Sequence, residues 1–189
     1  MLDTLVPAFA ADPLWGNPPA GGWAFPAPAD AVRLRRAIFR IWLEDALIYG
    51  GMRVTPNCEA VAAWFAPTGT VSSEGEEEMV TAWATAELGS QARALLTACA
   101  MLEAAHPQDR AHCYLALLGV HADHRGKGLG LALLRESLAE IDASGLPTYL
   151  ESTSAKNLPL YEGLGFKRIG VVALPDGGPP VDQLWREPG

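Results

Sequence analysis

The chain has 189 residues, of which 49% are hydrophobic and 19% are charged, and its formal net charge at pH 7 is −8. These values are typical of a globular chain with a full core, and we expect one domain over residues 1–189. They exclude a largely disordered chain. The acidic charge argues against nucleic acid as a partner and weakly favours a cationic ligand such as an amine.

The sequence gives no sign of membrane insertion, export or metal binding. Its apolar stretches are shorter than the roughly 18–20 residues of a membrane span, and its start, Met1 to Thr4, does not resemble a secretory signal. Cys58, Cys99 and Cys113 are an odd number of cysteines without metal-ligand spacing. We therefore expect no disulfide framework and no metal, in a cytoplasmic protein with no membrane partner.

The first half of the chain has the pattern of helices on either side of two short strands. The expected elements are a helix over Asp3–Ala10, an irregular loop over Gly16–Pro28, a helix over Asp30–Tyr49, strands at Met52–Thr55 and Glu59–Phe65, and helical sequence from Glu76 to Glu103. We expect Asp30 to be an N-cap, a serine of the loop 70–75 to cap the next helix, and Gly89-Ser90 to interrupt that helix.

The second half alternates strands and helices. The expected elements are a strand over His112–Val120, a helix over Gly128–Ala143, a strand over Thr148–Ser152, a short helix over Asn157–Gly163, and strands over Phe166–Leu174 and Val181–Trp185. The first of these strands is a continuous apolar run, which suits a buried central position. The long helix has an apolar stripe made of Leu131, Leu134, Leu138 and Ile141. Strands mixed with helices indicate an α/β or α+β fold.

The segment Val120–Gly130 has the composition of an anion-binding loop. Its glycines let backbone N–H groups approach a ligand closely, and the N-terminus of the following helix adds its dipole. Arg125, Lys127 and two histidines add local positive charge in an acidic chain. The spacing fits neither a P-loop nor a dinucleotide-binding fingerprint, which needs a third glycine where Leu131 stands. A glycine-rich connector without a ligand is the alternative.

A second motif lies downstream, from Leu150 to Phe166. Asn157 and Tyr161 are four residues apart, so on a helix both side chains project from one face. Pro159 is tolerated only in the first turn, and Gly163 or Gly165 can supply the left-handed residue that ends the helix.

Arg125-x-x-Gly128-x-Gly130 and the downstream run from Asn157 to Phe166 resemble the two coenzyme A motifs of the GNAT superfamily of N-acetyltransferases. The likeness extends over Pro13–Pro188 and is nearest to the puromycin N-acetyltransferase group. It implies an α+β fold with a mixed, mostly antiparallel sheet of about six to seven strands flanked by helices. Residues 1–110 would form the acceptor side, and residues 111–189 would bind acetyl-CoA.

One departure from the family concerns the start of the chain. Such proteins begin with a strand, whereas a helix is expected here almost from Met1. Either the chain is truncated or the sheet lacks its first edge strand. A newly exposed edge would favour pairing with another chain.

The resemblance also implies roles for individual residues in cosubstrate binding. The strands around 112–120 and 148–153 are expected to splay apart around the pantetheine arm, which the backbone of Leu118 and Val120 would hold. A backbone N–H near Val120 would face the oxyanion. The residues expected to bind acetyl-CoA are Leu118, Val120, Arg125, Gly126, Lys127, Gly128, Leu129, Gly130, Asn157 and Tyr161.

The same resemblance suggests an acid and a base. Tyr161 is the expected general acid, because a phenol is protonated at neutral pH and can donate to a sulfur anion, although a core tyrosine is the alternative. Glu151 is the expected base, because burial raises a carboxyl pKa, with a salt bridge as the alternative. His112 and His121 are second choices for the base. We do not expect a covalent acetyl group on Cys113, because no base stands at a recognisable spacing.

The acceptor cannot be identified from this sequence, but its chemical type can be narrowed. The tryptophans of the first half that could form an aromatic wall attracting an amine are Trp15, Trp23, Trp42, Trp64 and Trp83. The expected function is acetyl transfer to a primary amine of a small molecule by direct attack. The alternatives are a protein N-terminus or lysine as acceptor, a longer acyl donor, and a non-catalytic acyl-CoA-binding domain. A homodimer is the default oligomer.

Overall fold

The computed structural model describes residues 1–18, 21–25, 30–65 and 74–189. Its elements in chain order are α1 (Leu2–Ala8), α2 (Ala31–Tyr49), β1 (Gly50–Val54), β2 (Ala60–Phe65), α3 (Glu74–Leu88), η1 (Gly89–Gln91), α4 (Ala92–Ala105), β3 (Cys113–Val120), η2 (Ala122–His124), α5 (Leu129–Ala143), β4 (Thr148–Ser152), η3 (Ala155–Asn157), α6 (Leu158–Glu162), β5 (Lys167–Ala173) and β6 (Pro180–Arg186).

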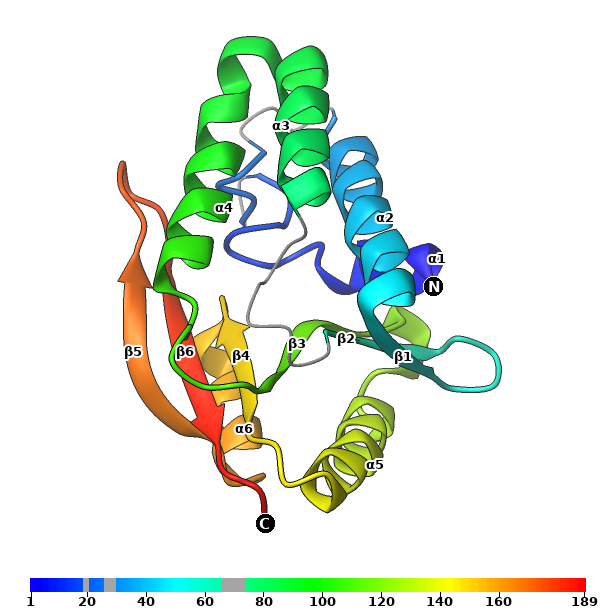
Figure 1. The fold of residues 1–189 in the computed structure, drawn as a ribbon. Coiled ribbons are helices and arrows are strands. Elements are labelled where there is room, and N and C mark those ends of the chain that lie inside the picture. Colours follow the sequence, from blue (N-terminus) through cyan, green and yellow to red (C-terminus); the bar gives the residue numbers. More distant parts are fainter. Residues whose placement is uncertain (19–20, 26–29, 66–73) are drawn as a thin grey trace.

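The strands form one six-stranded sheet in the order β1-β2-β3-β4-β6-β5. The central pair β3–β4 is parallel and the other four neighbouring pairs are antiparallel. The predicted α+β fold with a mixed, mostly antiparallel sheet is therefore confirmed. The chain enters the fold through α1, and β1 is an edge strand of the sheet (Figure 1).

Helices cover both faces of this sheet because strand side chains alternate between the faces. Along β2, the side chains of Val61, Ala63 and Phe65 join a core with α1 to α4. The side chains of Ala60, Ala62 and Trp64 join a second core with α5 and α6. Figure 1 shows α2, α3 and α4 on one side of the sheet and α5 on the other.

The predicted helix ends and breaks can be compared with the structure at four places. Asp30 is the N-cap residue of α2, as predicted, but its side chain makes no capping bond, and its carboxylate lies 3.4 Å from the Arg33 guanidinium. The predicted break at Gly89-Ser90 is confirmed, because the 3₁₀ turn η1 separates α3 from α4. Gly165, with φ +91°, is the left-handed glycine after α6. The loop expected over 70–75 lies largely outside the described residues.

The sheet opens between its two central strands. The β3–β4 ladder ends at the pair Leu115–Leu150. Just beyond it, Ala63 of β2 pairs with Leu117 while Trp64 pairs with Leu115, so Ala116 is an extra residue on β3. Such a bulge bends a strand and increases its twist. The bend turns the rest of β3 away from β4 and leaves a gap between the strands.

Candidate active site

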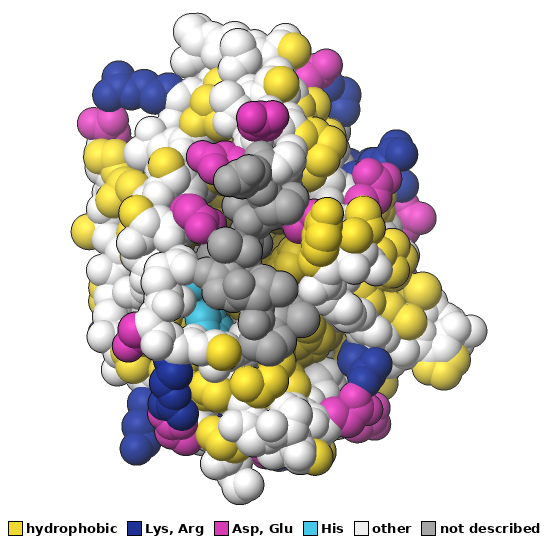
Figure 2. All heavy atoms as spheres, in the orientation of Figure 1, with side chains coloured by type: hydrophobic (Ala, Val, Ile, Leu, Met, Phe, Trp, Pro, Cys, Tyr) yellow, Lys and Arg dark blue, Asp and Glu magenta, His cyan; other side chains and the backbone are white. Residues whose placement is uncertain are grey.

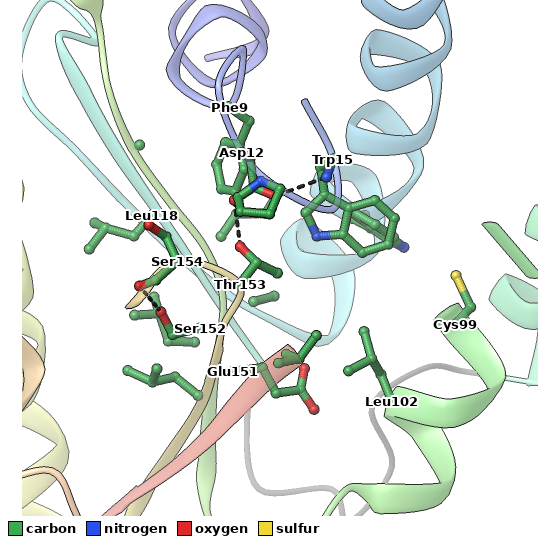
Figure 3. Close-up of a pocket in the computed structure, with 18 of the residues that line it drawn as sticks. Phe9, Asp12, Trp15, Cys99, Leu102, Leu118, Glu151, Ser152, Thr153 and Ser154 are labelled. Atoms are coloured by element: carbon green, nitrogen blue, oxygen red, sulfur yellow. Dashed lines mark hydrogen bonds between the residues drawn. The ribbon is translucent and has the colours of Figure 1, made fainter. Parts of the chain in front are cut away.

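A cavity of about 1010 Å³ extends from this gap to the helices above the sheet. Its described lining comes from β2, β3 and β4, from α2, α3, α4 and η3–α6, and from the segment that follows α1. Figure 3 shows Glu151 and Leu102 on opposite walls, with Asp12 and Trp15 above them. The gap in the sheet is therefore one end of a larger chamber.

The loop between β3 and α5 has the backbone conformation of an anion site. Gly126 and Gly128 have φ values of +74° and +75°, and a Cβ atom at either position would meet nothing within 4 Å. Glycine is needed there for the conformation rather than for space. Gly130 is needed for packing, because its Cβ would lie 2.9 Å from Cγ2 of Val120. This packing brings the N-terminus of α5, with its unpaired N–H groups, beside the gap.

Arg125 is an exposed residue whose side chain reaches back to the first helix. Its guanidinium donates to the backbone carbonyls of Pro7 and Ala8 at 3.3 and 2.9 Å, at the end of α1. Arg125 therefore fastens α1 to the loop, and the cavity reaches the loop at this residue. The adjacent stretch Gly126–Gly130 lies outside the cavity wall, and its backbone amides stay available to a phosphate.

Glu151 on β4 is held by two phenols. The hydroxyl of Tyr114 donates to Oε2 and that of Tyr149 donates to Oε1, both at 2.9 Å. Desolvation raises the pKa of Glu151 to about 7, although the two hydrogen bonds oppose this rise. The nearby charge of Glu103 on α4 raises the pKa further. A carboxyl group with this pKa can accept and release a proton near neutral pH.

Tyr161 lies in α6, at the other side of the gap. Its ring is 7% exposed and packs edge-on against Phe166, with ring centroids 5.9 Å apart. Burial and the negative charge of Asp12 raise the pKa of Tyr161 to about 12, so its phenol remains protonated at neutral pH. Asn157 lines the same cavity as Tyr161, as expected of two residues on one helical face.

Sequence reasoning missed Asp12. Its Oδ1 accepts hydrogen bonds from the backbone N–H groups of Leu14 and Trp15 at 2.9 and 2.8 Å, and the hydroxyl of Thr153 donates to Oδ2 (Figure 3). Burial raises the pKa of Asp12. The Asp12-Pro13 pair predicts a turn of this kind, but nothing local in the sequence predicts the contact with Thr153.

Arg35 of α2 was also missed, because its spacing matches that of the surface arginines beside it. The side chain is only 1% exposed. Its guanidinium donates to the carbonyls of Val6 and Trp15 at 2.9 and 3.0 Å and to Oδ1 of Asn17 at 2.8 Å. Arg35 thus anchors the segment that carries Asp12 and Trp15 over the cavity.

The remaining candidates lie elsewhere. His112 pairs with His106 through their Nε2 atoms at 2.9 Å, and Nδ1 of His121 accepts from the N–H of Asp123. Neither His112, His121 nor Cys113 is part of the described cavity wall, and burial raises the pKa of the Cys113 thiol. These placements give no support to the two second-choice bases.

The expected aromatic wall is only partly present. Trp15 and Trp42 line the cavity and pack edge-on, with ring centroids 5.2 Å apart. Trp23, Trp64 and Trp83 are not part of the described lining. Trp64 packs on the opposite face of the sheet, because it occupies the alternate position on β2.

In the described part of the chain, no group of three or more His, Cys, Asp or Glu side chains is placed to hold a metal ion. Within the same residues, none of the helices has the length and hydropathy needed to cross a membrane.

The fold and site can now be compared with known proteins. Residues 82–168 match the family model described as an acetyltransferase (GNAT) domain. An uncharacterized N-acetyltransferase of Schizosaccharomyces pombe is 42% identical over 77 residues, which are 40% of this chain and 31% of that protein. The chain therefore aligns with less than a third of that curated relative.

Two solved structures align over the whole chain. The crystal structure titled histone acetyltransferase HPA2 and related acetyltransferase, from Corynebacterium glutamicum, is 26% identical, with a TM-score of 0.66 and 89% of its chain covered. A structure from Pyrococcus horikoshii shares the fold at 14% identity, with a TM-score of 0.58 and 90% of its chain covered.

These findings define the class of protein first: an α+β fold shared with acyltransferases, opened at its central parallel strand pair. Over residues 82–168 the chain is similar to the GNAT family of acetyltransferases, and over its whole length it shares the fold of the Corynebacterium glutamicum acetyltransferase. A GNAT domain implies an acyl-CoA cosubstrate.

Proposed function

We propose that the protein is an N-acetyltransferase that moves the acetyl group of acetyl-CoA to a primary amine of a small molecule. The observation that carries this proposal is the arrangement around the gap between β3 and β4. Glu151 lines one wall of the gap and Tyr161 lines another, and the glycine loop before α5 lies at its mouth. The puromycin N-acetyltransferase likeness of the sequence motifs agrees with an amine acceptor.

The loop conformation fits the phosphates of coenzyme A. Exposed N–H groups at the start of α5 and two left-handed glycines suit a pyrophosphate. The unpaired edge of β3 beyond Leu115, with Leu118 and Val120, would hold the pantetheine arm by backbone hydrogen bonds. When bound, the cosubstrate supplies a thioester whose carbonyl carbon is open to attack by an amine.

The two titratable groups divide the proton transfers. Glu151 accepts a proton from the acceptor ammonium, and the neutral nitrogen forms a bond to the acetyl carbon. As the carbon–sulfur bond breaks, Tyr161 donates its phenolic proton to sulfur and then recovers the extra proton from the new amide nitrogen. A backbone N–H near Val120 stabilises the negative charge on the acetyl oxygen. The net products are an acetamide, a thiol and one proton.

The acceptor side of the cavity is covered by a chain segment, which favours a small acceptor over a protein tail. The segment from Pro7 to Asp12 crosses the cavity and is fastened at both ends, to Arg125 beyond β3 and to Thr153 after β4. An extended peptide would need an open groove where this segment lies. A protein N-terminus or lysine is therefore the second candidate, favoured only if the segment is released.

The proposal is tested by measuring acetyl-CoA binding by calorimetry and then thiol release with small primary amines. We expect binding, and release that depends on the amine. Binding without release for any amine or peptide would point to the regulatory acyl-CoA-binding alternative. Absence of binding would refute the proposed role of the loop before α5.

A further inference from the structure

The part of the cavity away from the gap has a composition that suits one kind of acceptor. One face of α4 contributes Leu96 and Cys99, which are three residues apart, and Leu102 lines the cavity farther along the helix. Trp15 and Trp42 form the wall opposite. Figure 3 shows Cys99 and Leu102 projecting from α4 into the space that Glu151 also faces. We call these five residues the apolar chamber.

Carboxylates gather at one end of this chamber. Glu77 is the first residue of α3 in the cavity wall, and Glu103 lies near the end of the wall that α4 forms. Because η1 joins the two helices as a hairpin, both residues lie at the end nearest the sheet (Figure 1). The charge of Glu103 acts on Glu151. Three carboxyl groups from three elements thus line the end where Glu151 would deprotonate an amine.

The charges along the cavity are segregated. Arg125 and Lys156 are the cations of its described lining, and both lie on the coenzyme side. Around the apolar chamber the charged groups of the described lining are all acidic. In Figure 2, Asp and Glu side chains lie above a hollow in whose depth hydrophobic side chains are visible. Such a site attracts a cation and offers it apolar contact.

We propose that the acceptor is a monoamine with a hydrophobic, ring-sized body, such as an arylalkylamine, whose ammonium faces Glu151 and whose body fills the apolar chamber. This inference rests on the proposed acetyl transfer and specifies its substrate class. A polyamine would leave a second ammonium group among Leu96, Cys99 and the tryptophan rings, where a charge is costly to desolvate. A very small polar amine would leave the chamber without contacts.

The experiment compares 2-phenylethylamine with ethylamine and putrescine on the full chain. Amine binding is followed by tryptophan fluorescence in the presence of coenzyme A, and transfer by thiol release from acetyl-CoA. We expect kcat/KM for 2-phenylethylamine to exceed that for the other two by at least about tenfold, because a ring buries far more apolar surface than a methyl group.

The variant Cys99→Phe narrows the chamber without touching Glu151 or Tyr161. We expect it to lower kcat/KM for 2-phenylethylamine about tenfold while the value for ethylamine changes little, which makes ethylamine a control within the same protein. Trp42→Leu should also lower kcat/KM for 2-phenylethylamine. Trp83→Leu should not, because Trp83 lies outside the described cavity lining. Circular dichroism checks that each variant folds.

The outcomes separate this inference from the proposed function. If thiol release from acetyl-CoA is fastest with putrescine or ethylamine, the proposed acetyl transfer is supported but the proposed substrate class is wrong. If tryptophan fluorescence shows that 2-phenylethylamine binds but no thiol is released from acetyl-CoA, the apolar chamber is supported as an amine site and the proposed acetyl transfer is overturned. If Cys99→Phe impairs transfer from hexanoyl-CoA but leaves amine preference unchanged, the chamber holds an acyl chain and the inference is wrong. If the protein shows no amine binding and no thiol release, both the proposed function and the substrate class are overturned.

Discussion

The coenzyme end and the acceptor end of the cavity are built in different ways. At the coenzyme end, the binding groups are backbone amides in one continuous loop, Val120–Gly130, oriented by two left-handed glycines. At the acceptor end, they are side chains from α2, α3, α4 and the segment after α1, far apart in the sequence. Substitutions should therefore separate the two ends experimentally.

Replacing Tyr161 with Phe should act on chemistry and not on either binding end. The ring and its contact with Phe166 remain, while the proton donor is lost. We expect kcat to fall at least about 100-fold, the range for loss of general acid–base catalysis, and the acetyl-CoA dissociation constant to stay unchanged. Stopped-flow thiol release and calorimetry measure the two. Full activity in the variant would show that Tyr161 is a core residue.

Gly128→Ala tests the coenzyme end, and Gly145→Ala is its matched control. Both glycines are left-handed, with φ values of +75° and +72°, and neither has an atom within 4 Å of an added Cβ. Each substitution should cost about 1 kcal/mol of stability. Only Gly128→Ala should also weaken the binding of acetyl-CoA, by about tenfold, because strain at this position shifts the phosphate-binding loop. Equal affinities in the two variants would contradict the phosphate-loop assignment.

Tyr149→Phe tests how the acceptor end sets the ionisation of Glu151. Tyr149 lies behind the described cavity wall and donates to the carboxylate, which favours the ionised form. Its loss should raise the pKa of Glu151 from about 7, by about one pH unit. The rising limb of the kcat/KM profile against pH should move upward by that amount. The exposed substitution Tyr49→Phe is the control, and an unmoved limb would mean that another group is the base.

The same pKa predicts a smaller effect on stability. Glu151 has a folded-state pKa near 7 against an ordinary value of 4.5, so the folded protein binds this proton more tightly than the unfolded chain. Its contribution is complete below pH 4.5 and is lost as pH rises through 7. Glu151→Gln should flatten this decline, with a difference on the order of 1 kcal/mol in denaturant titrations. Glu162→Gln, exposed on α6, should change nothing.

The contrast between the two ends also explains what the sequence could predict. The glycine loop and the Asn157–Tyr161 helix are local, so spacing alone indicated both, and the order of strands and helices indicated the mixed sheet. Glu151 was chosen because it interrupts an apolar strand. The two phenols that hold it come from β3 and β4, and their convergence depends on register. The i, i+2 spacing places Tyr149 and Glu151 on one face of β4, but no local pattern encodes the approach of Tyr114 from β3.

Asp12 and Arg35 illustrate the same limit more sharply. An arginine among the surface arginines of α2 has the same local signature whether its side chain is exposed or, like that of Arg35, buried. Of the irregular loop expected over Gly16–Pro28, the described residues 16–18 and 21–25 lack regular structure, as predicted. Irregular chain can nevertheless be placed only through its tertiary contacts. The missing capping bond of Asp30 has a related cause, since a nearby arginine competes for the carboxylate.

The bond between Thr153 and Asp12 joins residues that are 141 positions apart. During synthesis, Thr153 leaves the ribosome 141 residues after Asp12, and Arg125 leaves it 118 residues after Pro7. Contacts of such long sequence separation form late and slow folding. The wall that this segment forms over the cavity can therefore be completed only after Thr153 has been made, whereas Trp15 can pack on Trp42 of α2 much earlier.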